Sequence, residues 1–257
     1  MLYRIEGIIL RTVDYGEGNK IITVLTQAGK VGLMARGAKK VKSRLSAVTQ
    51  LLIYGEFVFF KQSGMGTLNH ADIIEPYHRL REDIYLSAYA SYLVEMVDKM
   101  LPEGEANIYL FEQLKSALKT MEEGKDPQIV VHIFEMAMLA SAGYSPVMDV
   151  CVSCGSVDGD MMFSSLMGGI LCPGCTHKDP QKIRISENTR KLLRLFTGMD
   201  IRRLGNVTVK EETRQQLKTC MRAYMDTHVG VQWKARKVLD QLDKYDFKRI
   251  DKPLLHK

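Results

Sequence analysis

The chain has 257 residues, of which 46% are hydrophobic and 26% charged, and its formal net charge is +6. This length suits about two domains, the composition is that of an ordinary globular protein, and the sequence contains no apolar run long enough for a membrane-spanning helix. The first residues, Met1 to Glu6, have the pattern of a strand and not of a secretory signal, so we expect a cytoplasmic protein.

The charge is unevenly distributed along the chain. Residues 1–80 carry a net +5, residues 81–150 a net −7, residues 151–180 a net −2, and residues 181–257 a net +10. Two basic segments therefore flank an acidic one. Basic surface of this kind indicates a polyanionic partner, most often nucleic acid, although a solvated surface of mixed sign is the alternative.

Residues 1–80 have the period-2 pattern and the glycine-rich turns of short strands. Five strands are predicted, over residues 5–13, 20–26, 30–36, 51–61 and 67–74. Five short strands in so short a segment favour a small closed β-barrel. The five-stranded OB-fold is the leading candidate, and an SH3-like barrel is the alternative that the pattern leaves open.

From Arg81 the apolar period changes to about 3.6, which predicts helices. The first ends at Pro102, the second covers residues 110–121, and the third has Asp126 as its N-cap and Pro127 at its first helical position. Three more helices are expected, starting near Ser186, Val209 and Trp233. The predicted fold class is therefore α+β multidomain, with an OB-fold domain at 1–80 and a helical bundle domain at 81–257.

Four cysteines form two close pairs between the third and fourth predicted helices: Cys151 with Cys154, and Cys172 with Cys175. Two C-x2-C knuckles at this separation can place four thiolates around one Zn²⁺ ion, and Gly155 and Gly174 can help the backbone turn beneath it. Disulfides or redox thiols are the alternative, which a reducing compartment disfavours. We expect a zinc knuckle inserted at about residues 148–180, with one structural ion per chain, because four thiolates leave no open coordination position.

Catalytic motifs are missing from the sequence. There is no phosphate-binding loop of the P-loop type and no dinucleotide-binding glycine motif after a strand. We interpret His132 and Cys220 as ordinary helix residues. His177 is not expected to bind the zinc ion, because four cysteines already complete its tetrahedral coordination. The protein is not expected to be an enzyme.

The segment from Arg36 to Arg44 is the strongest candidate for a binding site. It holds five cations and no acidic residue: Arg36, Lys39, Lys40, Lys42 and Arg44. Such a loop can neutralise phosphates without reading sequence, although a merely solvated loop has the same composition. Aromatic residues that could stack on bases are near it in sequence, at Tyr15, Tyr54, Phe57, Phe59 and Phe60, and strand alternation must bury at least half of them.

Three further stretches are informative beside the cysteine pairs: Gly7–Arg11, Lys30–Lys40 and Ala142–Pro146. In these features the chain resembles the RecO family of bacterial recombination mediators, and the resemblance covers its whole length. It implies an N-terminal OB-fold and an embedded zinc site. Arg11 joins the five loop cations as a candidate DNA-binding residue. Because some members of the family lack the four cysteines, the metal is expected to serve local stability.

The resemblance also implies a function in the RecF pathway of DNA repair and homologous recombination. It implies binding of single- and double-stranded DNA, annealing of complementary strands in the presence of single-stranded DNA-binding protein (SSB), and loading of RecA together with RecR. Such a protein would be cytoplasmic and associated with the nucleoid. The acidic tail of SSB would suit a basic-rimmed apolar groove on the helices, with candidate rim residues Arg190, Lys191, Arg194, Arg202 and Arg203.

Two other classes of function stay open. An RNA-binding OB-fold and zinc-knuckle factor without a role in recombination would share the basic barrel but would prefer RNA. A zinc-dependent enzyme would need a ligand other than cysteine and an open coordination position, and the sequence offers neither.

Overall fold

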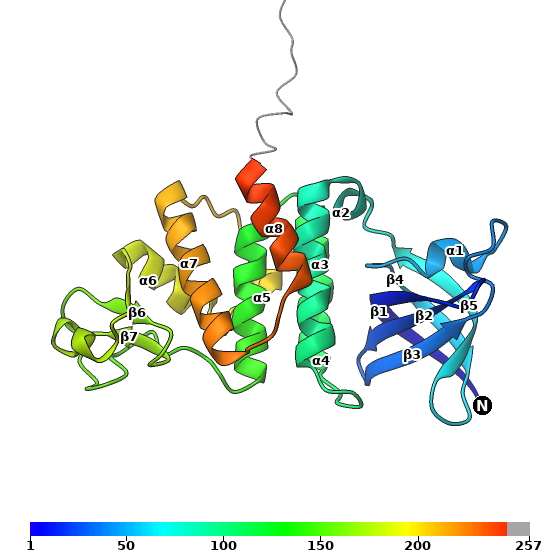
Figure 1. Cartoon of the computed structure of the whole chain (residues 1–257), viewed down its shortest axis with the longest axis horizontal. Helices are drawn as coiled ribbons and strands as arrows, with labels where there is room; N and C mark the ends of the chain where they lie inside the picture. Colours follow the sequence, from blue (N-terminus) through cyan, green and yellow to red (C-terminus); the bar gives the residue numbers. More distant parts are fainter. Residues whose placement is uncertain (246–257) are drawn as a thin grey trace, which may run out of the picture. The chain divides into compact units, whose positions relative to one another are not determined.

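Five strands close into a barrel in the order β1-β2-β3-β5-β4 (Figure 1). A short helix, α1, lies between β3 and β4 in the chain, which is the arrangement of an OB-fold. The computed structural model describes residues 1–245 of the chain. The barrel elements are β1 (Leu2–Tyr15), β2 (Asn19–Thr26), β3 (Gly29–Ala35), α1 (Leu45–Val48), β4 (Tyr54–Phe60) and β5 (Gly66–Glu75).

The barrel closes through one short parallel pairing between β3 and β5, in which Leu33 is opposite Gly66 and Met34 is opposite Thr67. A Cβ atom at Gly66 would lie 2.6 Å from the Phe59 ring and 2.8 Å from the Leu33 side chain. Glycine is therefore needed where the two strands meet over the core. That core is made of side chains from all five strands, with Ile9, Ile22 and Phe57 completely buried.

The predicted helices are present, with short irregular connections between them. Their bounds are α2 (His78–Glu82), α3 (Ile84–Met100), α4 (Ile108–Glu122), α5 (Pro127–Ser141), α6 (Glu187–Phe196), α7 (Glu211–His228) and α8 (Lys234–Tyr245). The predicted starts of two of them are confirmed, because Asp126 accepts hydrogen bonds from the backbone of Gln128 and Ile129, and Ser186 accepts one from that of Thr189. Among the described residues, no helix combines the length and apolarity needed to cross a membrane.

Packing divides the chain into two compact units. Within the described residues, the first contains Met1–Glu123 together with residues 233–245, and the second is Gly124–Gln232. The barrel, α2, α3, α4 and α8 thus belong to one unit, and α5, the cysteine pairs, α6 and α7 to the other. This division differs from the boundary at residue 80, which marks where strands give way to helices. Residues 246–257, which were counted in the basic C-terminal segment, lie outside the described residues.

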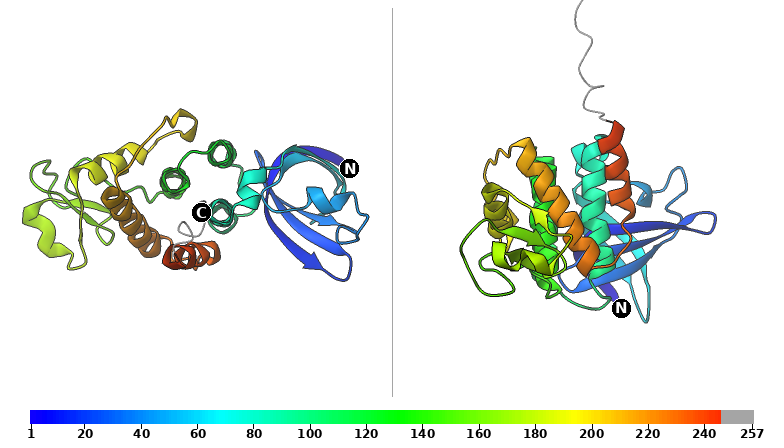
Figure 2. Two further views of the ribbon diagram at one scale, coloured as in Figure 1. Left: turned by 90° about the horizontal axis from the view of Figure 1, so that it is seen from above. Right: turned by 60° about the vertical axis from the view of Figure 1, so that its left-hand side comes forward.

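In the first unit, α8 returns to pack along α3 (Figure 2). The Trp233 ring meets the Tyr92 ring edge-on, with 5.7 Å between centroids, and both side chains are almost fully buried. The Glu95 carboxylate of α3 accepts hydrogen bonds from the backbone N–H groups of Lys234 and Ala235. A carboxylate from one helix therefore caps the first turn of the other.

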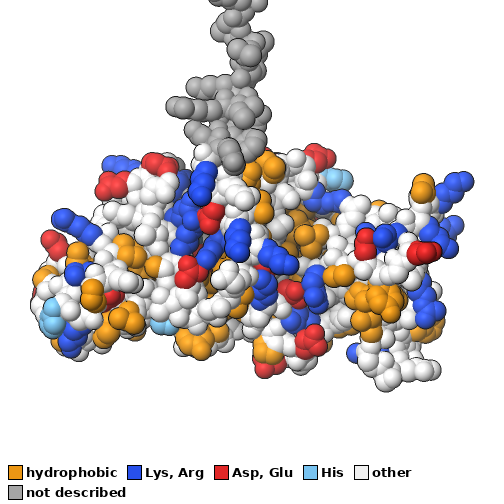
Figure 3. All heavy atoms as spheres, in the orientation of Figure 1, with side chains coloured by type: hydrophobic (Ala, Val, Ile, Leu, Met, Phe, Trp, Pro, Cys, Tyr) orange, Lys and Arg blue, Asp and Glu red, His pale blue; other side chains and the backbone are white. Residues whose placement is uncertain are grey.

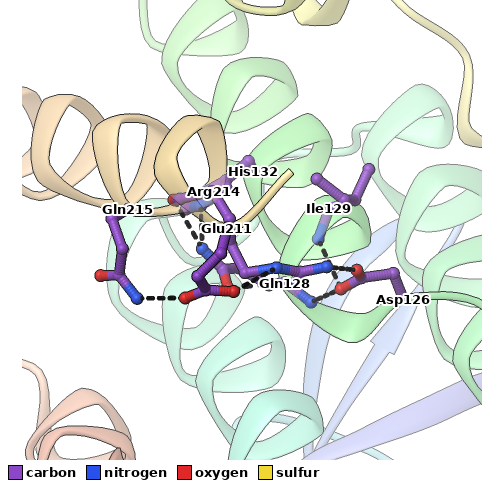
Figure 4. Close-up of polar contacts among 7 residues, drawn as sticks. All are labelled: Asp126, Gln128, Ile129, His132, Glu211, Arg214 and Gln215. Atoms are coloured by element: carbon purple, nitrogen blue, oxygen red, sulfur yellow. Dashed lines mark hydrogen bonds and ion pairs between the residues drawn. The ribbon is translucent and has the colours of Figure 1, made fainter. Parts of the chain in front are cut away.

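In the second unit, a polar network joins the start of α5 to α7 (Figure 4). The Arg214 guanidinium binds the Asp126 carboxylate, and the Gln128 amide donates to the Arg214 carbonyl oxygen at 3.1 Å. Burial alone would raise the pKa of Asp126, but the hydrogen bond from Arg214 keeps this pKa below its usual value. His132, which is buried, pairs with Glu135 at 2.8 Å. This confirms the interpretation of His132 as a residue of the helix core.

We expect Arg214→Met to lower the free energy of unfolding of the second unit by about 1–3 kcal/mol, because it leaves Asp126 without its charged partner. A carboxyl with a lowered pKa in the folded state stabilises the protein above its unfolded pKa, near 4, and loses that contribution as the pH falls through the folded value. Urea unfolding at pH 7 would measure the first effect, and a series from pH 4 downward would measure the second, because the lowered pKa of Asp126 places the loss below pH 4. The variant should depend less on pH in this lower interval.

The matched control for this measurement is Arg190→Met, which removes an ion pair with Glu187 inside a single helix. Such a pair contributes little, so a change below about 0.5 kcal/mol is expected. Equal losses of stability in the two variants would show that the α5–α7 network adds nothing specific.

Candidate metal centre and nucleic-acid interface

The four cysteine sulfur atoms lie within 4.8 Å of one another. The first pair sits in a turn in which Gly155 donates its backbone N–H to the Cys151 carbonyl oxygen, and Gly155 has a φ of +76°, which favours glycine. The second pair flanks the start of a 3-10 helix, η1 (Pro173–Lys178). Gly174 is not in the left-handed region, so the predicted need for glycine is confirmed at Gly155 and not at Gly174.

A small sheet supports the two pairs. Its strands are β6 (Met162–Ser164), β7 (Gly169–Leu171) and β8 (Ile183–Arg184), in the order β7-β6-β8. The backbone N–H of Val152 donates to the carbonyl oxygen of Ile170, which ties the first turn to β7. A Cβ at Gly169 would lie 2.2 Å from the Val147 carbonyl oxygen, so glycine permits the chain before the first pair to approach the sheet.

The electrostatics of the four thiols match a cation site. Burial would raise the pKa of Cys151, but backbone hydrogen bonds from Cys172, Ser153 and Cys154 lower it to about 6. The backbone of Ser156 favours the Cys154 thiolate, whereas contact with the other three sulfurs raises the pKa of Cys154 to about 12. Four thiolates this close repel one another, so all four can ionise together only around a cation.

These distances fit Zn²⁺. Zinc–sulfur bonds of about 2.3 Å at tetrahedral angles place sulfur atoms about 3.8 Å apart, and the Cys154 and Cys172 sulfurs are 3.6 Å apart. Cys151, Cys154, Cys172 and Cys175 would hold the ion, which would cross-link the two turns and leave no position for a substrate. His177 is not in the cluster, and among the described residues no other group of metal-ligating side chains is found.

The basic loop, residues 36–44, follows β3 at one end of the barrel. All five of its cations are exposed, and Figure 3 shows Lys and Arg side chains gathered beside α1 on the barrel. Ala38, in the middle of the loop, is completely buried and belongs to the barrel core. The loop is therefore anchored by an apolar side chain while its charged side chains stay in solvent.

Three interactions fasten this loop to the turn between β1 and β2. The Gly37 backbone N–H donates to the Asn19 side chain at 2.8 Å, and the Lys39 backbone N–H donates to the Gly18 carbonyl oxygen at 3.1 Å. The Lys39 ammonium binds the Asp14 carboxylate at 2.8 Å, and this hydrogen bond lowers the pKa of Asp14. Sequence reasoning missed Asn19 and Asp14, whose only signal was their position beside a glycine-rich turn.

Arg11 lies apart from the basic loop. Its guanidinium is 3.4 Å from the Asp98 carboxylate of α3 and 3.4 Å from the Thr23 hydroxyl. Asp98 also accepts a hydrogen bond at its carbonyl oxygen from Lys30 of β3. Arg11 therefore contributes to the packing of the barrel on α3, and the structure does not bring it together with the other five candidates.

The rim proposed for the SSB tail is only partly assembled. Arg190 and Lys191 both pair with Glu187 of the same helix, Arg194 pairs with Asp149, and Arg202 pairs with Asp200. Of the five candidates, only Arg190 lines the 860 Å³ cleft between the zinc-knuckle segment and α6 and α7. The cleft also contains Arg184, Met161, Met162 and Ile185, together with the acidic residues Asp160, Glu187 and Glu212.

A closed OB-fold barrel with an anchored cationic loop, joined to helices and a tetracysteine cluster, defines an OB-fold protein with a knuckle-type metal site. Family models for the recombination protein O N-terminal and C-terminal regions match residues 1–77 and 81–237. The DNA repair protein RecO of Bacillus subtilis is 47% identical over 95% of this chain and 96% of its own length, and that of Halalkalibacterium halodurans is 45% identical over 96% and 98%. The chain belongs to the RecO family of DNA repair proteins.

We expect about one zinc ion per freshly purified chain, measured by elemental analysis. Cys→Ser at any of the four positions should release the metal and speed hydrogen exchange in residues 147–185, because a structural ion contributes folding free energy directly. Cys220→Ala is the control, since Cys220 is buried away from the cluster, where burial raises its pKa to about 12. A metal-free protein with unchanged protection would refute the zinc site.

Replacing Lys39, Lys40, Lys42 and Arg44 together by Ala should weaken binding to unrelated oligonucleotides about equally. The slope of log K against log salt should flatten by about 0.7 for each phosphate of a single strand that the loop no longer neutralises. Fluorescence anisotropy of labelled oligonucleotides over a salt series measures both quantities.

The charge-matched control replaces Lys119, Lys210, Lys237 and Lys244, which are exposed on α4, just before α7 and on α8. It changes the net charge equally without touching the loop. Asp14→Asn should have the opposite effect to the loop variant, with tighter binding and a steeper slope, because it frees the Lys39 ammonium. If loop and control variants behaved alike, the loop would not be the surface that binds DNA.

Proposed function

We propose that this protein is a recombination mediator that binds single- and double-stranded DNA and anneals complementary strands. The observation that carries the proposal is the basic loop on the OB-fold of a RecO family member, held in a fixed shape by Ala38 and by three interactions with the neighbouring turn. A loop ordered before binding loses little conformational entropy when it meets DNA.

Lys39, Lys40, Lys42 and Arg44 would contact phosphates and not base edges. Such contacts are blind to sequence, which suits a protein that must act on any pair of complementary strands. Annealing brings together two polyanions that repel each other. Cations on the protein lower this barrier by neutralising phosphate on the strands as they meet.

The partners in this proposal are SSB, RecR and, through them, RecA. An SSB tail is acidic with a terminal aromatic residue. The cleft offers Arg184, Arg190, Met161 and Met162, but Asp160, Glu187 and Glu212 line it too and oppose an acidic tail. The SSB partner is therefore proposed from membership of the RecO family and not from the charge of this cleft. The protein would work in the cytoplasm, associated with the nucleoid. It would lower a barrier between strands without turning over a nucleotide, and the zinc would serve only to hold the knuckle segment in shape.

The test is the annealing of complementary oligonucleotides that are precoated with SSB and carry a fluorophore and a quencher. The protein should accelerate annealing at least several-fold without ATP, and the fourfold loop variant should lose most of this acceleration. The charge-matched variant should keep it, because its loop is intact.

Three outcomes would count against the proposal: no acceleration over SSB-coated strands alone, an absolute requirement for ATP, or a clear preference for RNA strands. The last would favour an RNA-binding factor. A second measurement, capture of the protein by SSB with and without its acidic tail, tests the partner separately from the annealing.

A further inference from the structure

The aromatic side chains of the barrel fall into two groups that the sequence could not separate. Tyr54, Phe57 and Phe59 have exposed fractions of 8%, 0% and 3%, so they belong to the buried part of the fold. Tyr15 and Phe60 are 55% and 53% exposed. A ring that stacks on a base must present a face to solvent, which leaves these two residues of the five candidates.

Tyr15 is held beside the basic loop. It is the last residue of β1, and its partner across the turn is Asn19, the residue whose side chain accepts a hydrogen bond from Gly37 of the loop. Its neighbour Asp14 binds Lys39. Side chains of directly opposed strand residues lie about 5 Å apart at Cβ. The Tyr15 ring and the loop cations are therefore carried by one fastened assembly of turn and loop.

The barrel surface next to Tyr15 is apolar. Val13 is two residues earlier on β1, so its side chain points to the same face as that of Tyr15. Val13 is opposite Ile21 of β2, and Ile21 is opposite Met34 of β3. Val13 is 46% exposed, and Ile21 and Met34 are half-buried. Three strands thus place an apolar row beside one exposed aromatic ring.

We propose that this face binds an unpaired nucleotide, with its base stacked on Tyr15 and supported by the Val13–Ile21–Met34 row, and with its flanking phosphates on the basic loop. The base of a duplex is already stacked and paired, so it cannot use the ring. The stack would distinguish single strands from duplex and would hold a base in an accessible position for pairing. This inference rests on the proposed function and gives the loop site a preferred substrate, single-stranded DNA.

The experiment compares Tyr15→Ala, Tyr15→Trp and Tyr109→Ala by anisotropy with a single-stranded oligonucleotide and a blunt duplex of the same length. Tyr109 is an exposed tyrosine of α4, at 45%, and is the matched control. Tyr15→Ala should weaken single-strand binding about five- to a hundredfold, as expected when one base–aromatic stack is removed. It should leave the salt slope unchanged, because tyrosine carries no charge.

Duplex binding should change less than about twofold in all three variants, and Tyr15→Trp should retain single-strand binding, because indole also stacks. Equal weakening on single strand and duplex would overturn the inference and show that Tyr15 only supports the loop. So would an unchanged affinity of Tyr15→Ala for the single strand. The fourfold loop variant separates the two proposals: if it loses binding while Tyr15→Ala does not, only the stacking interaction is wrong, and if it binds normally, the loop site itself is wrong.

Discussion

Five cations within nine residues repel one another, and the structure of the basic loop must accommodate this repulsion. A loop of such composition would by itself be extended and mobile. Here, one neutral side chain, Ala38, enters the barrel core, backbone and side-chain hydrogen bonds join the loop to the turn of β1 and β2, and one carboxylate, Asp14, offsets one charge. The barrel therefore holds the loop in place. Of the anchoring interactions described here, only the ion pair between Lys39 and Asp14 involves a charged loop side chain, so the other four cations are not used in anchoring.

The tetracysteine segment also brings like charges together, but here they are the negative charges of thiolates. Thiolates crowded within 4.8 Å cannot all be charged without a cation, so the four cysteines could hold a metal ion beside a small apolar core that includes Phe163, Ile170 and Leu171. The supporting sheet has three short strands, and all three residues of β7 are buried. A bound ion would link the stability of the knuckle to metal availability, while the barrel has a core of its own.

Much of the fold follows from local sequence signals. The helix starts at Asp126 and Ser186, the five strands and the cysteine spacing are each encoded within a few residues, and each is found where the pattern predicts it. The interactions that sequence did not reveal are side-chain pairs between distant positions, such as Arg214 with Asp126 and Arg11 with Asp98. Charge patterning identifies Arg11 as a cation but cannot say which acid it will meet, because that depends on how the barrel packs on α3.

The path of the chain has a consequence for its synthesis. The first unit is interrupted by the second in the sequence, and the Trp233 ring, which packs edge-on against Tyr92 of α3, is made after the whole of residues 124–232. On the ribosome the barrel can form early, since all five strands lie within residues 1–75. The face of α3 that contacts α8 stays uncovered until almost the entire chain has been synthesised. A chain that ends before Trp233 would keep this surface of α3 exposed. Chaperones and proteases would then recognise the incomplete chain by its exposed apolar surface.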